Sequence, residues 1–218
     1  MDLEIKDVAD LLSVSETTVQ SWISEGKIPF YQMQDQYRFS RLEIEDWIIQ
    51  YKLRSQEGSS ISHGGMQHFC LYRALHQGDL LLYNEGSTKE GVIRSAMRAI
   101  APQLSADAEI LSELLLDREQ MMPTSLNQGI AVPHTRDFLH QGPADRIFVV
   151  YPQTPLEYGA LDGEPVHTLF FLFATTDKGH LQLLAKLAHF ASDSSALALL
   201  KQRPSKKELL DFVRAWES

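Results

Sequence analysis

The chain has 218 residues, 44% of them hydrophobic, with a formal net charge of −9 and a pI near 5.3. This acidic balance excludes a chain that is basic throughout, so a nucleic-acid role needs a local basic patch. The single cysteine, Cys70, excludes a disulfide framework and a cysteine-based zinc site, and it predicts a reducing, cytoplasmic location. No signal peptide and no membrane-spanning run are predicted, and the length allows two modest domains.

The first 54 residues are predicted to form a small domain of three helices and a hairpin. Apolar residues at helical spacing mark the buried face of the first helix: Ile5, Val8, Ala9, Leu11 and Leu12. Ser15 is a good N-cap for a second helix over residues 16–25, which Gly26 ends as a C-cap. Two strands and a third helix follow, over 29–33, over 37–40 and from the capping box Ser40-Arg41-Leu42-Glu43, with Ile44, Trp47 and Ile48 buried.

The order of these elements resembles the winged helix-turn-helix domain of the excisionase and MerR group. The resemblance rests on Asp7 to Leu12, Ser15 with Thr18-Val19, Gly26-Lys27-Ile28-Pro29, Tyr37-Arg38-Phe39 and Glu45-Asp46-Trp47. It implies a second helix that enters the major groove of DNA and a hairpin that contacts the phosphate backbone. The candidate DNA-binding residues are Thr17, Thr18, Gln20, Ser21, Lys27, Arg38 and Arg41.

The charge of this domain fits DNA binding poorly. Residues 1–57 contain six Lys and Arg against eleven Asp and Glu, a net charge of −5, and the predicted recognition helix contains no Lys or Arg. Because DNA affinity comes largely from phosphate neutralisation, we expect modest, salt-dependent binding that needs a homodimer to present two helices. The alternative is a helix-turn-helix reused for dimerisation or for docking to another protein.

A Ser- and Gly-rich stretch over residues 55–66 is predicted to be a linker, since its composition cannot build a core. Residues 67–218 alternate helical and strand-like patterns, which predicts an α/β domain with a mixed sheet covered by helices. The chain as a whole is therefore predicted to be a two-domain α+β protein. Helices are expected over 67–77, from Ser87-Thr88-Lys89-Glu90, over 107–118, over 180–191 and from the capping box Ser205-Lys206-Lys207-Glu208 to about Trp216; strands are expected over 79–84, 129–133, 147–152 and 167–174.

Two histidines in this second domain are candidates for chemistry. His134 ends a short apolar run that starts at Gly129 and that Pro133 closes, because proline has no N–H to donate. A histidine held in one direction behind a proline suits a nucleophile. His180 lies where an apolar-periodic helix begins, and the N–H groups at a helix start attract anions. The pair indicates phosphoryl chemistry, although each histidine taken alone reads as an ordinary one.

Four separated motifs resemble the enzyme IIA domain of the fructose/mannitol family of the bacterial sugar phosphotransferase system, including its nitrogen-regulatory branch. The resemblance covers roughly residues 68–216, and its motifs are Leu114 to Glu119 with Thr124, Gly129 to His134, Tyr158 to Val166, and His180 to Ala188. The resemblance implies that His134 accepts a phosphoryl group and that His180 and Arg118 line the same site. Thr124, Gly129 and Pro133 belong to the loop around it. Met122 to Gln128 departs from the glycine-rich family pattern, which affects the loop shape and partner docking more than the chemistry.

Other chemistries are poorly supported by the sequence. The histidine spacings match no zinc pattern, no Gly-x-Ser-x-Gly is present for a serine hydrolase, and no glycine-rich phosphate loop is present for ATP. We therefore expect neither a metal nor a cofactor. The resemblance implies that the phosphoryl donor is another phosphoprotein, the small histidine phosphocarrier of the same system.

Three functions remain open at this point. The leading one is a regulatory protein of the phosphotransferase system, in which the phosphorylation state of His134 modulates binding to DNA or to a target protein. The second is a sugar-specific enzyme IIA that passes its phosphoryl group to a IIB domain of a permease. The third is a binding module in which the histidine no longer turns over. The fused N-terminal domain favours the first, because a transport carrier has no use for it.

Overall fold

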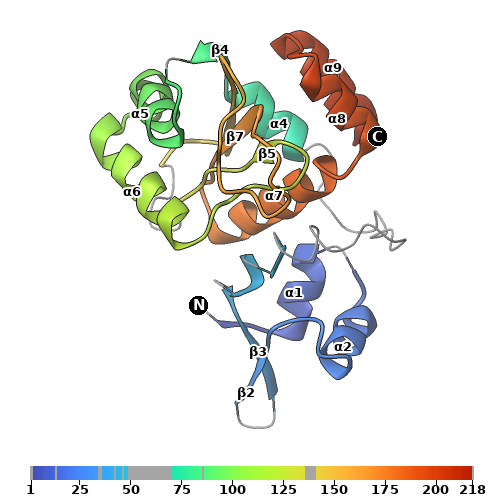
Figure 1. The fold of residues 1–218 in the computed structure, drawn as a ribbon. Helices are drawn as coiled ribbons and strands as arrows, with labels where there is room; N and C mark the ends of the chain where they lie inside the picture. The colour runs from blue at the N-terminus through green and yellow to red at the C-terminus, as the bar shows by residue number, and fades with distance from the viewer. Residues whose placement is uncertain are drawn as a thin grey trace.

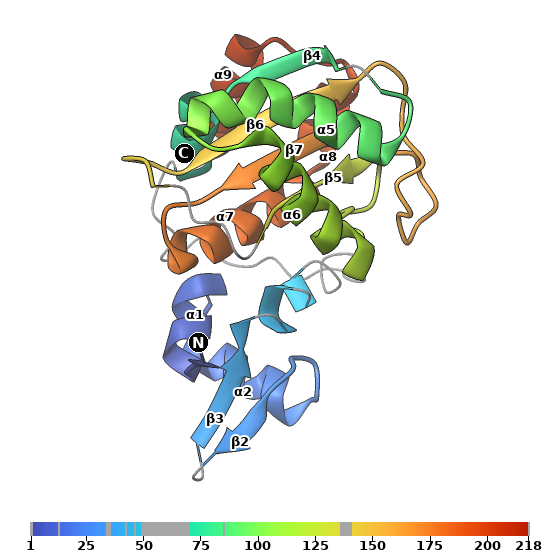
Figure 2. The same ribbon diagram turned by 90° about the vertical axis from the view of Figure 1, so that its left-hand side faces the viewer.

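The computed structural model describes residues 2–12, 14–33, 36–41, 43–45, 47–48, 70–84, 86–135 and 141–217. The predicted linker over 55–66 lies outside these residues. Figures 1 and 2 show two bodies: a small N-terminal domain in blue, and a larger α/β domain whose helix α7 faces it. The fold is therefore the mixed α+β, two-domain arrangement that the sequence predicts.

The N-terminal domain is a helix-turn-helix with a small antiparallel sheet. Its labelled elements are β1 (Asp2–Leu3), α1 (Ile5–Leu12), α2 (Glu16–Ser24), β2 (Tyr31–Met33) and β3 (Gln36–Ser40). The sheet has the strand order β1-β3-β2, and β3 is antiparallel to both neighbours. A third helical segment follows β3, and its described residues are 41, 43–45 and 47–48.

Local sequence features explain where these helices begin and end. The side chain of Ser15 accepts a hydrogen bond from the backbone N–H of Thr18 at 3.1 Å, which caps the start of α2. Gly26 has a φ of +63°, a conformation that glycine adopts without strain, and it follows the end of α2. Trp22 packs against Trp47 with ring centroids 5.4 Å apart, which joins α2 to the third helical segment. The N-cap Ser15 is as predicted, whereas α2 ends at Ser24 with Glu25 as its C-cap, so Gly26 lies one position beyond the cap; β1 is an addition to the predicted hairpin.

The second domain contains the remaining described elements. They are α4 (Cys70–Gln77), β4 (Leu80–Asn84), α5 (Lys89–Ile100), the 3₁₀ helix η1 (Ala101–Leu104), α6 (Ala108–Met121), β5 (Ile130–Ala131), β6 (Arg146–Pro152), β7 (Thr168–Phe173), α7 (Asp177–Phe190), α8 (Ser194–Lys201) and α9 (Lys206–Trp216). The sheet has the order β4-β6-β7-β5, with β4 parallel to β6, β6 antiparallel to β7, and β5 parallel to β7. This is the predicted mixed sheet.

Helices cover both faces of this sheet (Figure 1). Along β6, Ile147, Val149 and Tyr151 contribute to one buried cluster, whereas Phe148 and Val150 contribute to the other. The alternation follows from the period of two in a β-strand. The first cluster includes residues of α4, α7, α8 and α9, and the second includes residues of α5 and α6. Both faces of β6 are therefore buried, which explains its nearly continuous apolar sequence.

Three helix boundaries in this domain differ from the prediction, and one helix was not predicted. The N-cap of α5 is Thr88, whose side chain accepts from the N–H of Gly91, and Ser87 precedes it. Helix α6 continues past Arg118 to Met121. Helix α7 starts at Asp177 because Thr176 caps it, so His180 lies within its first turn. Helix α8 is absent from the prediction because its start, Asp193 with two serines, has the composition of a turn.

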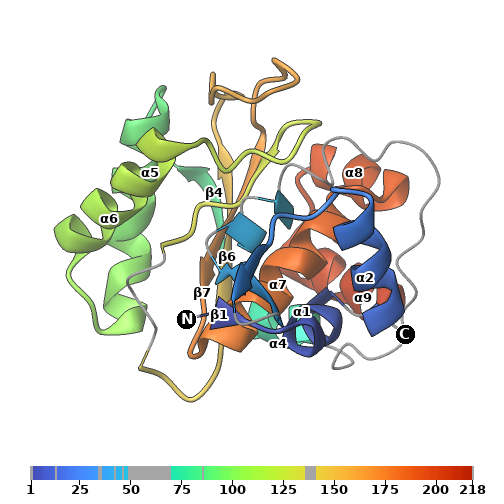
Figure 3. The ribbon, with the colours of Figure 1, turned by 90° about the horizontal axis from the view of Figure 1, so that it is seen from below.

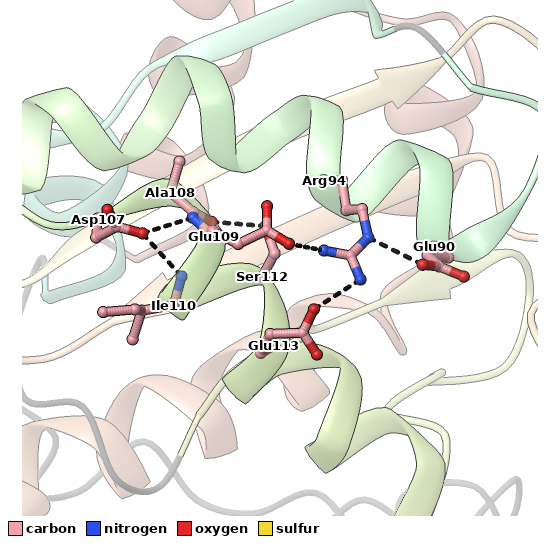
Figure 4. A network of polar contacts seen from close by, with 8 residues as sticks. All are labelled: Glu90, Arg94, Asp107, Ala108, Glu109, Ile110, Ser112 and Glu113. Atoms are coloured by element: carbon pink, nitrogen blue, oxygen red, sulfur yellow. Dashed lines mark hydrogen bonds and ion pairs between the residues drawn. The ribbon is translucent and has the colours of Figure 1, made fainter.

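A half-buried arginine joins α5 to α6 (Figure 4). The guanidinium of Arg94 contacts carboxylates of Glu90, Glu109 and Glu113 at 2.9, 2.6 and 2.7 Å. Asp107 caps α6 by accepting from two backbone N–H groups at its start, and this fixes the turn from which Glu109 projects. One cation therefore balances three carboxylates that belong to two helices.

The two domains share one apolar core. The cluster of buried apolar residues that includes α7 continues into the N-terminal domain through residues such as Leu12, Ile44 and Ile48. Helix α1 packs against α7, as Figures 2 and 3 also show. Within the described segments no single helix is long and apolar enough to cross a membrane; α7 and α8 pass that test together, but they meet at a bend of 85°.

The last described residue anchors the end of the second domain. The carboxylate of Glu217 accepts hydrogen bonds from the backbone N–H groups of Leu71 and Tyr72, at the start of α4, at 3.1 and 2.8 Å. It also pairs with Lys186 of α7, which is buried. A carboxylate at a helix start is favourable because the N–H groups there carry partial positive charge. The contact therefore holds α4, α7 and α9 together.

Candidate functional site

His134 is held at the end of β5 by the neighbouring strand. The carbonyl of Pro133 accepts from the N–H of Leu172 at 3.1 Å, and His134 forms a parallel bridge with Leu172 of β7. The strand proper covers only Ile130–Ala131, shorter than the predicted run over 129–133. The His134 side chain is completely buried. The rigid Pro133 and the pairing with β7 therefore give this histidine one fixed direction.

His180 lies beside His134. Their ring centroids are 5.1 Å apart and their planes are inclined by 64°. The backbone N–H of His180 bonds to the carbonyl of Thr176, the residue whose hydroxyl caps α7. The first turn of α7 therefore fixes His180, and the end of a strand fixes His134. The structure brings the two predicted histidines together.

The hydrogen bonds of His134 define its chemistry. Its Nδ1 lies 2.7 Å from the backbone carbonyl oxygen of Val132, which can only accept a hydrogen bond. This contact places the proton of the neutral ring on Nδ1 and leaves the lone pair on Nε2. The Nε2 atoms of both histidines are buried. The arrangement presents a neutral, oriented imidazole nitrogen, which is what nucleophilic attack requires.

The loop before β5 is tied back onto the histidine strand. The carbonyl of Thr124 accepts from the N–H of Val132 at 2.9 Å, and Leu126 donates to the carbonyl of Ile130 at 2.7 Å. Gly129 has a φ of +79°, and a Cβ there would lie 2.5 Å from the ring of His167. Gly129 therefore serves both the turn and the close approach of β7. The departure from the glycine-rich family pattern leaves this loop paired with the histidine strand.

A buried carboxylate organises the same loop. Glu119 accepts hydrogen bonds from the hydroxyl and the N–H of Thr124, and Lys89 lies 3.8 Å from it. Burial raises the pKa of Glu119, against the opposing effect of these contacts. Burial also raises the pKa of Tyr158 well above its usual range, with the neighbouring Glu119 as the next cause. Glu119, Thr124 and Tyr158 lie within the motifs that carry the family resemblance, so the order of those motifs is the signal that identifies them.

Arg118 is buried near the end of α6, next to Glu119. Its Nη1 donates to the carbonyl of Met122 at 2.8 Å. Its positive charge favours the ionised form of Tyr158 and so partly opposes the rise in the pKa of that side chain. These contacts place the guanidinium against the loop that leads to Thr124. Its action on a phosphoryl group at His134 stays a prediction.

The N-terminal domain reaches the histidine pair, which the sequence does not predict. Glu45, in the third helical segment, is completely buried, and its Oε1 lies 3.8 Å from Nε2 of His180. Arg41 contacts the same Oε1 at 3.0 Å and also contacts Asp177 of α7 at 2.6 Å. A contact between two domains leaves no trace in local sequence patterns, so no motif signals Glu45.

Glu45, His134 and His180 are the described residues that have the composition of a metal site. One ligand atom from each lies within 4.8 Å of the others, and all three are buried. Two histidines and a glutamate form a ligand set that zinc uses in catalytic sites. The predicted absence of a metal therefore remains a prediction at this position.

The candidate DNA-binding residues do not form a uniform basic face. On α2, Thr17, Gln20 and Ser21 are exposed and Thr18 is half-buried. Lys27 pairs with Glu25, and Arg38 pairs with Glu4. Arg41 contacts Asp177 of the second domain. The structure therefore brings the two predicted histidines together, whereas each of the three predicted DNA-binding cations contacts a carboxylate.

The fold and the site define an enzyme IIA-type domain preceded by a helix-turn-helix domain. Residues 74–216 match the family described as "Phosphoenolpyruvate-dependent sugar phosphotransferase system, EIIA 2", and residues 3–51 match a helix-turn-helix domain family. The chain belongs to this EIIA 2 family, and the family matches agree with both resemblances found in the sequence.

Relatives in both branches of the family are similar to the second domain. A "Nitrogen regulatory protein" of Pseudomonas aeruginosa is 31% identical over 147 residues, which cover 66% of this chain and 94% of that protein. The "PTS system fructose-specific EIIABC component" of Bacillus subtilis is 28% identical, over 59% of this chain and 20% of that protein. The crystal structure of nitrogen regulatory protein IIA-Ntr from Neisseria meningitidis superposes with a TM-score of 0.55 at 28% identity, covering 65% of this chain and 94% of that chain.

Proposed function

We propose that the protein is a regulatory member of the phosphotransferase system whose His134 accepts a phosphoryl group from the histidine phosphocarrier protein. The observation that carries the proposal is the anchored His134: its Nδ1 is bonded to the carbonyl of Val132, and the ring centroid of His180 lies 5.1 Å from its own. The proposal needs no cofactor and places the protein in the cytoplasm with the other proteins of that system.

The transfer is a displacement at phosphorus. The lone pair on Nε2 of His134 attacks the phosphorus of the donor's phosphohistidine, forming a new N–P bond while the donor's N–P bond breaks. The electron pair of the broken bond returns to the donor imidazole, so the two histidines exchange the group without a net proton transfer. His180 and Arg118 would supply positive charge or donors to the phosphoryl oxygens.

The N-terminal domain favours regulation over transport. A helix-turn-helix adds nothing to the passage of phosphate, whereas it adds a binding surface that the phosphorylation state can control. We infer that this surface binds duplex DNA as a homodimer, through exposed groups on α2 together with Lys27, Arg38 and Arg41, or binds a target protein. The second candidate function is a IIA carrier for a IIB domain, which the similarity to a fructose-specific component supports.

The proposal is tested by incubating the full chain with phosphoenolpyruvate, enzyme I and the histidine phosphocarrier protein. We expect one acid-labile phosphate per chain, and none in His134→Ala. Labelling of His134→Ala at the rate of the unaltered protein would assign the acceptor elsewhere. Adding a IIB domain separates the two functions, since a carrier loses its label to IIB within one turnover and a regulator keeps it.

DNA binding has its own test. Selection from a random duplex library at low and moderate salt, with and without phosphorylation, asks whether any sequence is enriched. We expect enrichment at low salt that phosphorylation changes: added negative charge opposes DNA binding, whereas release of Arg41 from Asp177 favours it. If a folded protein enriches nothing at low salt, the domain binds a protein partner instead.

A further inference from the structure

The N-terminal domain covers the phosphoacceptor pair with a carboxylate. Glu45 is completely buried, as is His134, and His180 is only 1% exposed. The carboxylate oxygen of Glu45 and one ring nitrogen of each histidine lie within 4.8 Å of one another. A group buried this deeply between two domains is inaccessible to a partner protein while the domains stay together.

Arg41 holds this carboxylate in place. Its guanidinium contacts Glu45 of its own helix at 3.0 Å and Asp177 of the other domain at 2.6 Å. Asp177 is the first residue of α7 and lies three positions before His180. The ion pair between domains is therefore built on the same helix turn that positions the second histidine.

The contact between domains is also apolar. The buried cluster runs without interruption from the N-terminal domain into α7, and α1 packs along that helix. Burial of apolar side chains stabilises such a contact independently of salt. The docked arrangement is thus a defined state of the chain and does not rest on a single ion pair.

We propose that docking of the N-terminal domain and phosphorylation of His134 exclude each other, so that Glu45 caps the unphosphorylated site and the phosphoryl group expels it. This proposal rests on the proposed function and names its regulation. The domain that is released is the one that carries the helix-turn-helix, so its freedom to bind DNA or a partner becomes the output of the phosphorylation state.

Space and charge both support the exclusion. A phosphoryl group on Nε2 brings three oxygens, each needing a donor at roughly 2.7–2.9 Å, into a gap that the Glu45 carboxylate already fills. The group also brings close to two negative charges next to the charges of Glu45 and Asp177. Because linkage is reciprocal, docking must lower the equilibrium constant for phosphorylation of His134 by the factor by which phosphorylation weakens docking.

A divalent cation is the other occupant that this ligand set would accept. The positive charge beside Glu45 is already supplied by Arg41 at 3.0 Å, and a second cation there would repel the guanidinium. The geometry therefore favours an arginine-held cap over a metal bridge. A chelator should expose the histidines if a metal bridges the domains and should have no effect if Arg41 holds the cap.

The first test measures access to the histidines without any phosphorylation. The full chain is treated with diethyl pyrocarbonate, and modification of the His134 and His180 peptides is followed by mass spectrometry. We expect slow modification in the unaltered protein and a rate at least tenfold higher in Arg41→Ala. That change leaves the buried carboxylate of Glu45 without its positively charged partner, which destabilises the docked arrangement. Asp177→Asn removes only the charge that Arg41 meets on the second domain, leaves the Arg41–Glu45 pair in place, and gives a second variant that weakens docking should Arg41→Ala fail to fold.

The second test measures phosphorylation. Glu45→Gln removes the repelling charge and weakens the Arg41 contact, so we expect it to be labelled by the phosphocarrier roughly tenfold faster than the unaltered protein. Glu43→Gln is the matched control, since Glu43 is exposed on the same segment, and its rate should not change. Hydrogen exchange in the 177–190 and 2–12 peptides should rise on phosphorylation of the unaltered protein.

The outcomes separate this proposal from the proposed function. If no variant is phosphorylated but the histidines are protected and Arg41→Ala exposes them, the cap stands and the phosphoacceptor role fails. Modification of His134 as fast in the unaltered protein as in both opening variants overturns the cap, and so does a phosphorylated protein whose exchange is unchanged. If EDTA removes the protection of the histidines and Zn²⁺ restores it, a metal ion and not Arg41 holds Glu45 at the site.

Discussion

Arg41 and Asp177 lie 136 positions apart in the chain and are joined by a 2.6 Å ion pair across the two domains. The guanidinium that the sequence predicts for DNA phosphates is therefore engaged at the second domain. The remaining nitrogen of this guanidinium, Nη2, is buried, so a phosphate of DNA does not reach it in this arrangement. Occupation of the DNA site through Arg41 thus requires the domains to separate.

His180 and Arg118 are predicted to tune the phosphohistidine without carrying it. His180→Ala and Arg118→Ala should each still accept one phosphate, but with a rate or a phosphohistidine lifetime altered by roughly 10- to 100-fold, since each loses a charge-assisted hydrogen bond. Single-turnover labelling and the decay of the purified phosphoprotein measure the two effects. Unaltered kinetics in both variants would make these side chains purely structural.

Gly129→Ala is predicted to destabilise the site, and Gly163→Ala is its matched control. Both glycines have a positive φ, +79° and +71°, but a Cβ at Gly163 has no atom within 4 Å. Strain alone should cost Gly163→Ala about 1–2 kcal/mol of unfolding free energy. At Gly129 the clash with the ring of His167 adds to this, for a total of roughly 3 kcal/mol or more. Urea denaturation measures both, and equal losses would show that the close approach is unimportant.

The buried Glu119 should make stability fall as pH rises. Burial raises its folded pKa above the ordinary value near 4.5, so the folded protein binds more protons than the unfolded one between those two values. The stabilisation is complete below about pH 4.5 and is lost as pH rises through the folded pKa. Glu119→Gln should therefore gain stability relative to the unaltered protein with increasing pH. Urea midpoints between pH 4 and pH 8 test this, with the exposed Glu157→Gln as control.

Arg94→Met should lower the melting temperature by a few degrees in low salt. The change leaves Glu90, Glu109 and Glu113 facing one another without their shared cation (Figure 4). Because the three carboxylates are largely exposed, about 1 M NaCl should screen their repulsion and remove most of the difference in melting temperature between the variant and the unaltered protein. A loss that is the same at both salt concentrations would point to packing of the arginine stem instead.

The elements of this fold were predictable where local chemistry decides them. Ser15 and Ser205 cap helices as their sequences predict, and the Ser205–Glu208 capping box forms in full. Helix α8 was missed because Asp193 and its serines are also typical of a turn. Asp193 is in fact the N-cap, its side chain accepting from the N–H groups of Ser195 and Ala196, and good helix formers follow it. Burial of Ala196, Leu197 and Leu200 adds tertiary packing to this local preference.

The histidine pair was predictable and its cover was not. His134 and His180 belong to motifs that repeat a family order, so their proximity follows from the resemblance. Glu45 belongs to a motif of a different domain. The predicted linker between the two domains says nothing about how far apart they lie or how they are oriented. Its place at His180 depends on how two independently patterned surfaces pack, which neither pattern specifies.

The apolar cluster that continues from α1 into α7 has a thermodynamic consequence. Domains that share a core unfold cooperatively, so the capped protein should give one calorimetric transition whose calorimetric and van't Hoff enthalpies agree. Once the domains part, each must melt by itself, and the small N-terminal domain, with little surface to bury, should melt first. The number of heat-absorption peaks thus reports whether the two halves of this chain behave as one folding unit or as two.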